Sequence, residues 1–236
     1  MTAPPRGWQI EGMARVLEPD VDDPNPPTDG GAGGGDPWWH RPSRLAILAL
    51  AAVFLGVAGT LAATAHPGVR HGNAVDRGFL QDMRLHHEQA ITMADIMVEK
   101  PATAQNGDLR QIAREILFGQ QLEAGIMVQL LRDMDQPEAN TTSFAMGWMG
   151  HTMAAASMPG LATDDQLQQL VAATGADADR QFARLMITHH EAGITMARYA
   201  ADHAADGSVR ALARSMVTGQ RGEVVELTGF LTKLGG

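Results

Sequence analysis

DRGFLQDMRLHHEQAITMA, residues 76–94, recurs as DRQFARLMITHHEAGITMA at residues 179–197, with 11 identities in 19 positions. A second pair of blocks follows in the same order, because LRQIAREILFGQQLE at 109–123 and VRALARSMVTGQRGE at 209–223 share six identities. Matching blocks in the same order indicate a duplicated unit. Apolar residues recur at helical spacing in all four blocks, so each unit is predicted to be a helix, a short break and a second helix.

A single helical hairpin cannot cover its own apolar stripe. The two units are therefore expected to pack as an all-α four-helix bundle. Asn73, Asp108 and Ser208 are the predicted helix N-caps. The connection between the units contains two segments with the pattern of short helices, residues 143–158 and the run that starts after Thr163. No segment has the pattern of a β-strand.

The chain is predicted to have three parts. Residues 1–43 are rich in Pro and Gly and have no apolar period, which indicates a disordered tail. Residues 45–65 carry no charge over 21 positions, long enough to cross a hydrocarbon core of about 30 Å as a helix. The boundaries are a tail at 1–43, a transmembrane signal anchor at 44–65, and a bundle at 73–234 made of repeat one (73–134), a linker (135–175) and repeat two (176–234).

Two interpretations of the apolar run remain open. Ala63-Thr64-Ala65 has the small-x-small pattern of a cleavage site, and cleavage after Ala65 would release a secreted protein. A secretory signal normally lies within the first 15 to 30 residues, whereas this run begins at Leu45, which favours an uncleaved anchor. The arginines on its two sides are nearly balanced and leave the orientation open.

Composition and missing motifs exclude several functional classes. The 236 residues carry 18 Lys+Arg against 27 Asp+Glu, a net charge of −9, and no Cys. Disulfides, thiolate metal sites and Cys nucleophiles are therefore excluded, and the acidic balance argues against a nucleic-acid partner. The zinc-protease motif HExxH fails because Ile91 and Ile194 occupy the second histidine position, and no Glu-x-x-His of a di-iron bundle occurs. An enzymatic function would need an unfamiliar arrangement of catalytic residues.

The candidate chemistry lies on the inward faces of the four predicted helices. His87 and His190 fall on the apolar stripe, whereas His86 and His189 lie about 100° away and are expected to be partly exposed. An inward polar group must be hydrogen-bonded or bind an ion, because a lone one costs on the order of 1–3 kcal/mol. The inward polar residues are Asp76, His87, Gln120, Glu123, Asp179, His190, Gln220 and Glu223.

Two interpretations of this polar set remain open. In the first, His87 pairs with Glu123 and His190 with Glu223, which fixes helix register without a metal, and Asp76 is only a helix cap. In the second, the set binds a metal: imidazole with a thioether suits Cu(I), and imidazole with a carboxylate suits Zn(II), Cu(II) or iron. The candidate ligands are His86, His87, Glu123, His189, His190, Glu223, Met83 and Met186, with Asp76, Asp179, Met146, Met149, His151 and Met153 as secondary candidates.

Methionine supplies a second signal. Twelve of the 14 lie after residue 82, and Met146, Met149 and Met153 share one predicted helical stripe around His151. Such a stripe is typical of core packing or of an adaptable contact surface. The alternative is a thioether site for Cu(I) or Ag(I).

The pattern Asp-x-x-Phe-x-x-x-Met-x-x-His-His-x-x-Ala/Gly-Ile-x-Met-Ala, followed by Gly-Gln-x-x-Glu and then repeated, resembles the bacterial exported double-histidine family called domain-of-unknown-function family 305. The resemblance covers about residues 73–234. It implies a ferritin-like four-helix bundle outside the cytoplasm, with the N-terminal tail inside. Some relatives are associated with copper binding or resistance, and the family has no established activity. Met127 has Leu227 as its counterpart, so the two halves are not expected to bind alike.

The leading expectation is a membrane-anchored, extracytoplasmic bundle that binds copper, as Cu(I) or Cu(II), without catalysing a reaction; zinc and iron rank behind copper. The main rival is a structural or partner-binding bundle with a metal-free polar core. A metal-dependent redox enzyme ranks third. The expected partners are the membrane, through a single span, and a metal ion.

Overall fold

The computed structural model describes residues 71–101 and 107–235. Within these ranges the α-helices are α2 (Ala74–Glu99), α3 (Gly107–Asp133), α4 (Asp164–Ala172), α5 (Gly175–His203) and α6 (Gly207–Lys233). The all-α class is therefore confirmed. The predicted tail and membrane anchor lie outside the described residues, and no helix among those described has the length and apolar character needed to cross a membrane.

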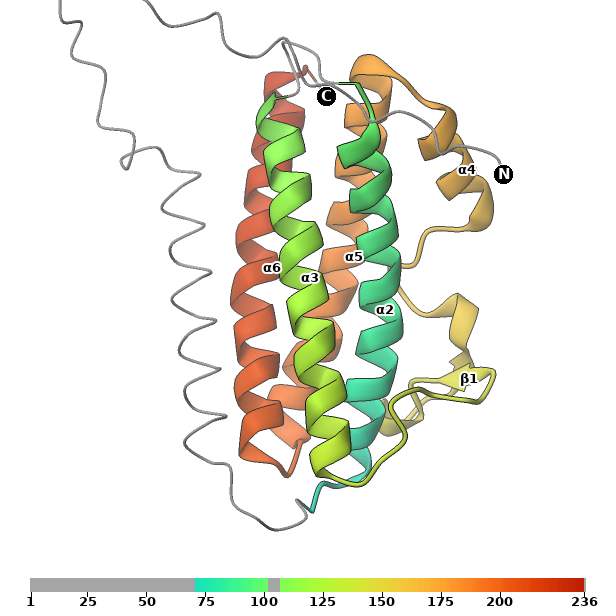
Figure 1. The fold of residues 1–236 in the computed structure, drawn as a ribbon, viewed down its shortest axis with the longest axis vertical. Coiled ribbons are helices and arrows are strands. Elements are labelled where there is room, and N and C mark those ends of the chain that lie inside the picture. The colour runs from blue at the N-terminus through green and yellow to red at the C-terminus, as the bar shows by residue number, and fades with distance from the viewer. Residues whose placement is uncertain (1–70, 102–106, 236) are drawn as a thin grey trace, which may run out of the picture. The chain divides into compact units, whose positions relative to one another are not determined.

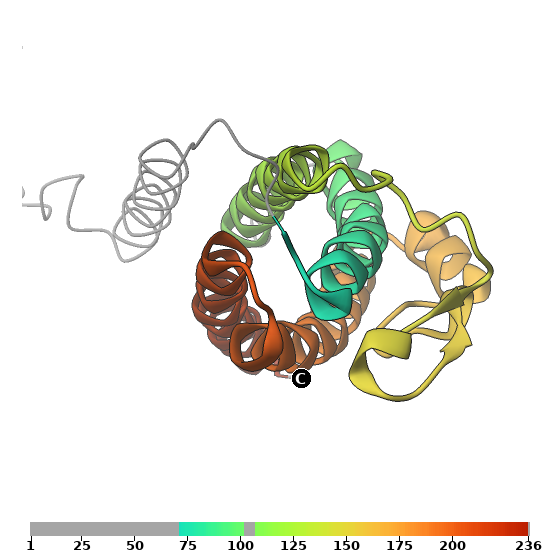
Figure 2. The same ribbon diagram turned by 90° about the horizontal axis from the view of Figure 1, so that it is seen from below.

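The four long helices lie side by side as an antiparallel bundle (Figure 1). α2 packs against α3 and α5, and α6 packs against α5 and α3, so the helices form a ring when viewed along the bundle (Figure 2). α3 ends at the opposite end of the bundle from the start of α5 (Figure 1). The connection between them therefore runs the length of the bundle, on the side formed by α2 and α5.

Capping residues set where α2 begins. The side-chain oxygen of Asn73 accepts hydrogen bonds from the backbone N–H groups of Val75 (2.8 Å) and Asp76 (3.0 Å), and Asp76 accepts one in return from the Asn73 N–H (2.7 Å). The Asp76 carboxylate also accepts from the N–H groups of Ala205 and Asp206, both at 2.9 Å. Asp76 is thus a helix cap that also joins α2 to the turn between α5 and α6.

Two predicted caps are displaced by one or two residues. Asp206, not Ser208, caps α6, because its carboxylate accepts the Ser208 N–H at 2.7 Å. Asp108 lies inside the first turn of α3, which begins at Gly107. Gly235 follows α6 with a positive φ of 73°, the left-handed conformation that glycine adopts at helix ends.

The connection between the hairpins departs from the predicted α-helix at 143–158. That segment contains strands β1 (Phe144–Ala145) and β2 (Met153–Ala154), paired antiparallel, and the short 3₁₀ turns η2 (Gly147–Met149) and η3 (Ala155–Ser157). The prediction that no strand occurs was therefore wrong for this segment. α4 lies where the second short helix is predicted, with Thr163 as its N-cap. We call residues 140–162 the strap.

A buried aspartate explains the shape of the strap. Asp82 on α2 is 2% exposed, and its carboxylate accepts hydrogen bonds from Asn140 Nδ2 (3.0 Å), the Met146 N–H (2.8 Å) and Trp148 Nε1 (2.8 Å). Met146 adopts φ 68° to direct its N–H at this carboxylate. Three bonds to one buried charge outweigh the weak helical pattern of the segment.

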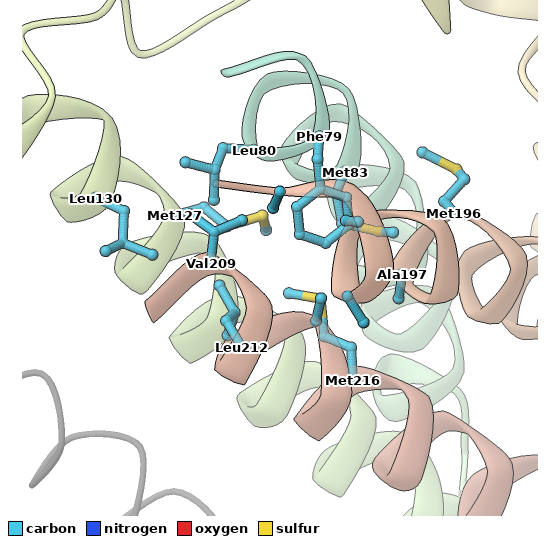
Figure 3. Packing of buried hydrophobic residues seen from close by; sticks show 14 of the residues in the cluster. Phe79, Leu80, Met83, Met127, Leu130, Met196, Ala197, Val209, Leu212 and Met216 are labelled. Carbon is cyan, nitrogen blue, oxygen red and sulfur yellow. The ribbon is translucent and has the colours of Figure 1, made fainter. Parts of the chain in front are cut away.

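Among the described residues, buried hydrophobic side chains form two clusters, one toward each end of the bundle. In the first cluster, Phe79 and Met83 on α2 pack with Leu212 and Met216 on α6 (Figure 3). The second cluster includes Met93, Ile116, Phe182, Met186 and Leu227. The long helices each carry polar residues between the positions that belong to the two clusters.

Candidate functional site

A layer of polar side chains separates the two apolar clusters. On α2, for example, His86 and His87 lie between Met83 of the first cluster and Ala90 of the second. All four histidines of the layer are 0% exposed, and both glutamines are 2% exposed. We call this set the polar layer, which comprises His86, His87, Gln120, Glu123, His189, His190, Gln220 and Glu223.

His86 and His189 are fully buried, contrary to the prediction that they border solvent. The strap covers them: the Pro159 carbonyl lies 3.1 Å from His86 Nε2, and a Cβ added to Gly160 would lie 3.1 Å from the His189 Cα. The two imidazole rings also contact each other, with centroids 3.7 Å apart and ring planes tilted by 34°. Helical periodicity places a residue relative to its own helix, and it does not reveal a distant segment that covers that residue.

Hydrogen bonds determine which ring nitrogen of these two histidines carries the proton. A carbonyl oxygen can only accept, so His86 Nε2–H donates to Pro159 O (3.1 Å) and His189 Nε2–H donates to His86 O (2.9 Å). The Nδ1 atom of each ring is then the unprotonated nitrogen. Among the described residues, neither Nδ1 atom has a hydrogen-bond partner.

Of the two predicted histidine–glutamate pairs, His87–Glu123 forms a hydrogen bond, whereas His190 and Glu223 only lie close to each other. His87 Nε2 lies 2.7 Å from Glu123 Oε2, a close hydrogen bond that leaves His87 Nδ1 without a partner among the described residues. His190 Nδ1 lies 3.3 Å from Glu223 Oε2, without hydrogen-bond geometry. The Gln120 amide Nε2, which can only donate, lies 3.4 Å from His190 Nε2. The two halves of the polar layer are therefore not equivalent in their hydrogen bonds.

Burial keeps the imidazoles of His86, His189 and His190 neutral. Burial, reinforced by the neighbouring His87, lowers the pKa of His86 to about 3, although the hydrogen bond to Pro159 opposes this shift. Burial, with His87 and His86 nearby, lowers the pKa of His190 to about 3 as well. Burial also brings the pKa of His189 well below its ordinary value of 6.5. Neutral imidazole is the form that ligates metals.

Glu223 has the opposite shift. Its burial, followed by repulsion from Glu123, Glu226 and Glu115, raises its pKa from 4.5 to about 8. Burial and the neighbouring carboxylates therefore favour the protonated form of Glu223 when no cation is bound.

The predicted methionine ligands lie in apolar surroundings. Met83 is 0% exposed in the first cluster and Met186 is 0% exposed in the second, on opposite sides of the polar layer. Met146, Met149 and Met153 pack on the first cluster, but they share no helical stripe because the strap is not an α-helix there. His151 is exposed.

Of the two secondary acidic candidates, Asp76 has a local structural role. Asp76 caps α2 and binds the turn after α5, as described above. Asp179, its counterpart in α5, is 1% exposed near the start of that helix. Across residues 71–101 and 107–235, no three or more His, Asp or Glu side chains are arranged to hold a metal ion. The metal-ligand roles of all these residues stay predictions.

Sequence reasoning missed the residues that hold the strap over the histidines. Gln89 binds the strap twice, donating to the Ala162 carbonyl (2.9 Å) and accepting from the Ala162 N–H (2.6 Å). Asp82 anchors the other end of the strap. One signal was present: Asp82 aligns with Leu185 in the second repeat, so an aspartate on the first helix stands where the repeat has an apolar residue.

The fold is similar to several solved structures. A DUF305 protein from Streptomyces coelicolor, named as secreted, is 30% identical with a TM-score of 0.62, over 69% of this chain and 94% of that one. A DUF305 fragment from Deinococcus radiodurans is 30% identical with a TM-score of 0.59, over 70% and 99%. CopM in the Cu(II)-bound form is 24% identical with a TM-score of 0.53, over 67% and 97%.

The similarity to CopM shows a shared fold alone. A comparison with curated proteins finds no match. The family pattern described as "Domain of unknown function (DUF305)" matches residues 76–231, which span both hairpins and the strap. The matched residues include the double histidines, the Gly-Gln-x-x-Glu motif and the bundle that unites them. This chain therefore belongs to the DUF305 family.

Proposed function

We propose that the polar layer binds a transition metal ion, copper above all, and that His86 and His189 supply the primary ligands through Nδ1. The observation that carries this proposal is the unpartnered Nδ1 lone pair on each of these neutral, buried rings. Metal-ligating histidines characteristically donate their other ring N–H to a carbonyl or carboxylate, and both rings do so here. The contact between the two rings brings these residues together from α2 and α5.

Donor chemistry supports copper. Imidazole nitrogen suits copper, zinc and iron, and Cu(I) is satisfied by fewer ligands than the three or more that a zinc site needs. The two Nδ1 atoms fit that requirement, with His87 Nδ1 as a further donor. Solved structures of CopM with Cu(I), Ag and Cu(II) show that a protein of this fold holds such ions, which supports the choice.

A metal-free structural core is the second candidate function. The His87–Glu123 bond of 2.7 Å satisfies both side chains without an ion, as a register-fixing pair would. Under this alternative, variants of the polar layer would change stability and would leave metal affinity unchanged.

We also propose that the bundle lies outside the cytoplasm, anchored by residues 44–65 or released after Ala65. Two observations support this location. Residues 45–65 form an uncharged apolar run, and the Streptomyces coelicolor relative is named as a secreted protein. The single long crossover between α3 and α5 supports the ferritin-like classification.

Equilibrium titration of the full-length apoprotein with Cu(I), Cu(II) and Zn(II) tests the metal proposal. We expect stoichiometric Cu(I) binding with a Kd below micromolar. The variants His86→Gln and His189→Gln retain an amide N–H near the position of Nε2 but lack the Nδ1 lone pair, so each is expected to weaken Cu(I) binding at least about tenfold, or 1.4 kcal/mol.

The exposed His151→Gln is the matched control and is expected to bind like the unsubstituted protein. Circular dichroism checks that each variant remains helical. Absence of Cu(I) binding tighter than micromolar, or unchanged affinity in folded His86→Gln and His189→Gln, would overturn the proposal.

A further inference from the structure

The strap closes one side of the polar layer. His86 and His189 lie where α2 meets α5, and the strap lies over them through Pro159 and Gly160. Gln89 fixes this part of the strap with two hydrogen bonds to Ala162. An ion that approached from this side would have to displace bonded backbone.

The opposite side of the bundle, where α3 meets α6, reaches the polar layer through carboxylates. Glu123 and Glu223 each have a side chain 13% exposed, while the imidazoles that they contact are 0% exposed. Each histidine–glutamate pair therefore extends from the interior toward solvent. A Cβ added to Gly119, one turn before Glu123 on α3, would meet nothing within 4 Å, so this position of the helix is open.

Two more glutamates extend this line of carboxylates outward. Glu115, Gly119 and Glu123 follow one another at intervals of four on α3, which places them on one helix face. Glu226 lies one turn from Gly222 on α6. Burial raises the pKa of Glu226, and repulsion from Glu115 raises it further. Within the described ranges, neither Glu115 nor Glu226 forms an ion pair with Lys or Arg.

An unpartnered buried group faces the same carboxylates. His190 Nδ1 is fully buried, lies 3.3 Å from Glu223 Oε2 and has no hydrogen-bond partner in the described part of the chain. A buried imidazole left unsatisfied beside an acidic seam indicates that a polar or cationic species is accommodated at this place.

We propose that the seam between α3 and α6, lined by Glu115, Glu123, Glu223 and Glu226, is the access route through which a metal cation passes from solvent to the polar layer. This inference rests on the proposed metal-binding function. The outer pair, Glu115 and Glu226, attracts the cation, and the inner pair passes it to the histidines. A line of carboxylates in a partly desolvated seam focuses cations and raises their association rate.

Stopped-flow measurement of Cu(I) uptake by the full-length apoprotein tests the route. The double variant Glu115→Gln/Glu226→Gln retains side-chain shape and removes two charges from the seam. Its association rate is expected to fall by about tenfold at low salt, and the difference should shrink at high salt because screening weakens attraction between exposed charges. Its binding stoichiometry should be unchanged.

The matched control is Glu99→Gln/Glu191→Gln, which removes the same charge from exposed positions on α2 and α5. Its uptake rate is expected to stay within twofold of the unsubstituted protein.

A second test is possible because the chain contains no Cys. The variant Leu122→Cys places a thiol beside Glu123 at a position that is 50% exposed, and labelling it with a bulky maleimide should slow uptake. The labelled variant Val171→Cys on α4 should take up Cu(I) at the normal rate.

Normal uptake by the seam variant, or equal slowing by the control, overturns the route and leaves the proposed function standing. Failure of the unsubstituted protein to bind Cu(I) at equilibrium overturns the proposed function and the route together.

Discussion

At the scale of single residues, the polar layer owes its character to burial. The imidazoles of His86, His189 and His190 stay neutral between the two apolar clusters because the interior disfavours their charged form. Oxygen acceptors such as Pro159 O then determine which nitrogen keeps the proton. The result is a set of unprotonated ring nitrogens whose positions are fixed by other residues. The strap that covers them is held mainly by Asp82.

Asp82→Ala is expected to lower the free energy of unfolding by about 2–4 kcal/mol. The substitution leaves the Met146 N–H and the Trp148 indole N–H without their acceptor, and each orphaned donor costs about 1–3 kcal/mol. Urea denaturation measures the change, and near-ultraviolet circular dichroism reports the environment of Trp148. Asp95→Ala, exposed on the same helix, is the control and should change stability by under about 0.5 kcal/mol. Equal stability of the two variants would contradict the role of Asp82.

At the scale of elements, the strap and the long helices depend on each other. Trp148 in the strap packs edge-on against Phe79 on α2 (5.7 Å between ring centroids) and against Tyr199 on α5 (5.6 Å). It also lies on Gly78, where an added Cβ would be 2.5 Å from the indole. Gly78 is therefore a contact point for the strap on α2, although glycine by itself weakens a helix.

Two glycine substitutions should change stability in opposite directions. Gly78→Ala is expected to destabilise the protein by about 1–3 kcal/mol, because the methyl group would displace Trp148. Gly125→Ala, in the middle of α3 with nothing within 4 Å of the added Cβ, is expected to stabilise it by about 0.5–1 kcal/mol through helix propensity. Thermal melts of the two variants compare them directly. If Gly78→Ala stabilised the protein as Gly125→Ala does, the strap contact would be unimportant.

At the scale of the whole molecule, the duplicated hairpins build two apolar ends and one polar middle. The balance between protonated and unprotonated groups in that middle makes stability depend on pH. Because the histidines and Glu223 shift in opposite directions, acid and alkali destabilise the fold through different residues.

Stability of the metal-free protein is expected to be greatest near pH 6.5. The pKa of His86 and of His190 falls from 6.5 to about 3 on folding, so their contribution is complete above pH 6.5 and is lost as the pH falls toward 3. The pKa of Glu223 rises from 4.5 to about 8, so its contribution is complete below pH 4.5 and is lost as the pH rises through 8. The acid side should be steeper, because more than one histidine titrates there.

Urea denaturation in the presence of a chelator, at about pH 5, 6.5 and 8, measures this profile. Glu223→Gln is the control, and it should remove most of the loss between pH 6.5 and 8 and make the rise from pH 5 to 6.5 steeper, because Glu223 no longer offsets the histidines there. Constant stability between pH 5 and 6.5 would show that the buried histidines do not stay neutral.

The sequence by itself determined the helices and the inward polar set. The repeat of Asp76 to Ala94 at Asp179 to Ala197 and the helical period predicted the hairpins, because these signals are local. The same period predicted the His87–Glu123 pair, which the structure contains, and the proximity of His190 to Glu223, although those two side chains form no hydrogen bond. The N-cap Asn73 could also be predicted from the sequence, because a capping side chain bonds backbone groups within three residues of itself.

Only the tertiary structure decided the burial of His86 and His189, the shape of the strap and the protonation of the polar layer. Pro159 lies 73 positions from His86, so no periodicity links the two. The helical pattern of Met146 to Met153 gave way to hydrogen bonds with Asp82, 64 positions from Met146. The pKa of Glu223 depends on Glu123 and Glu115 from another helix. These features arise from contacts between distant segments, whose energies exceed the local preferences that a sequence pattern records.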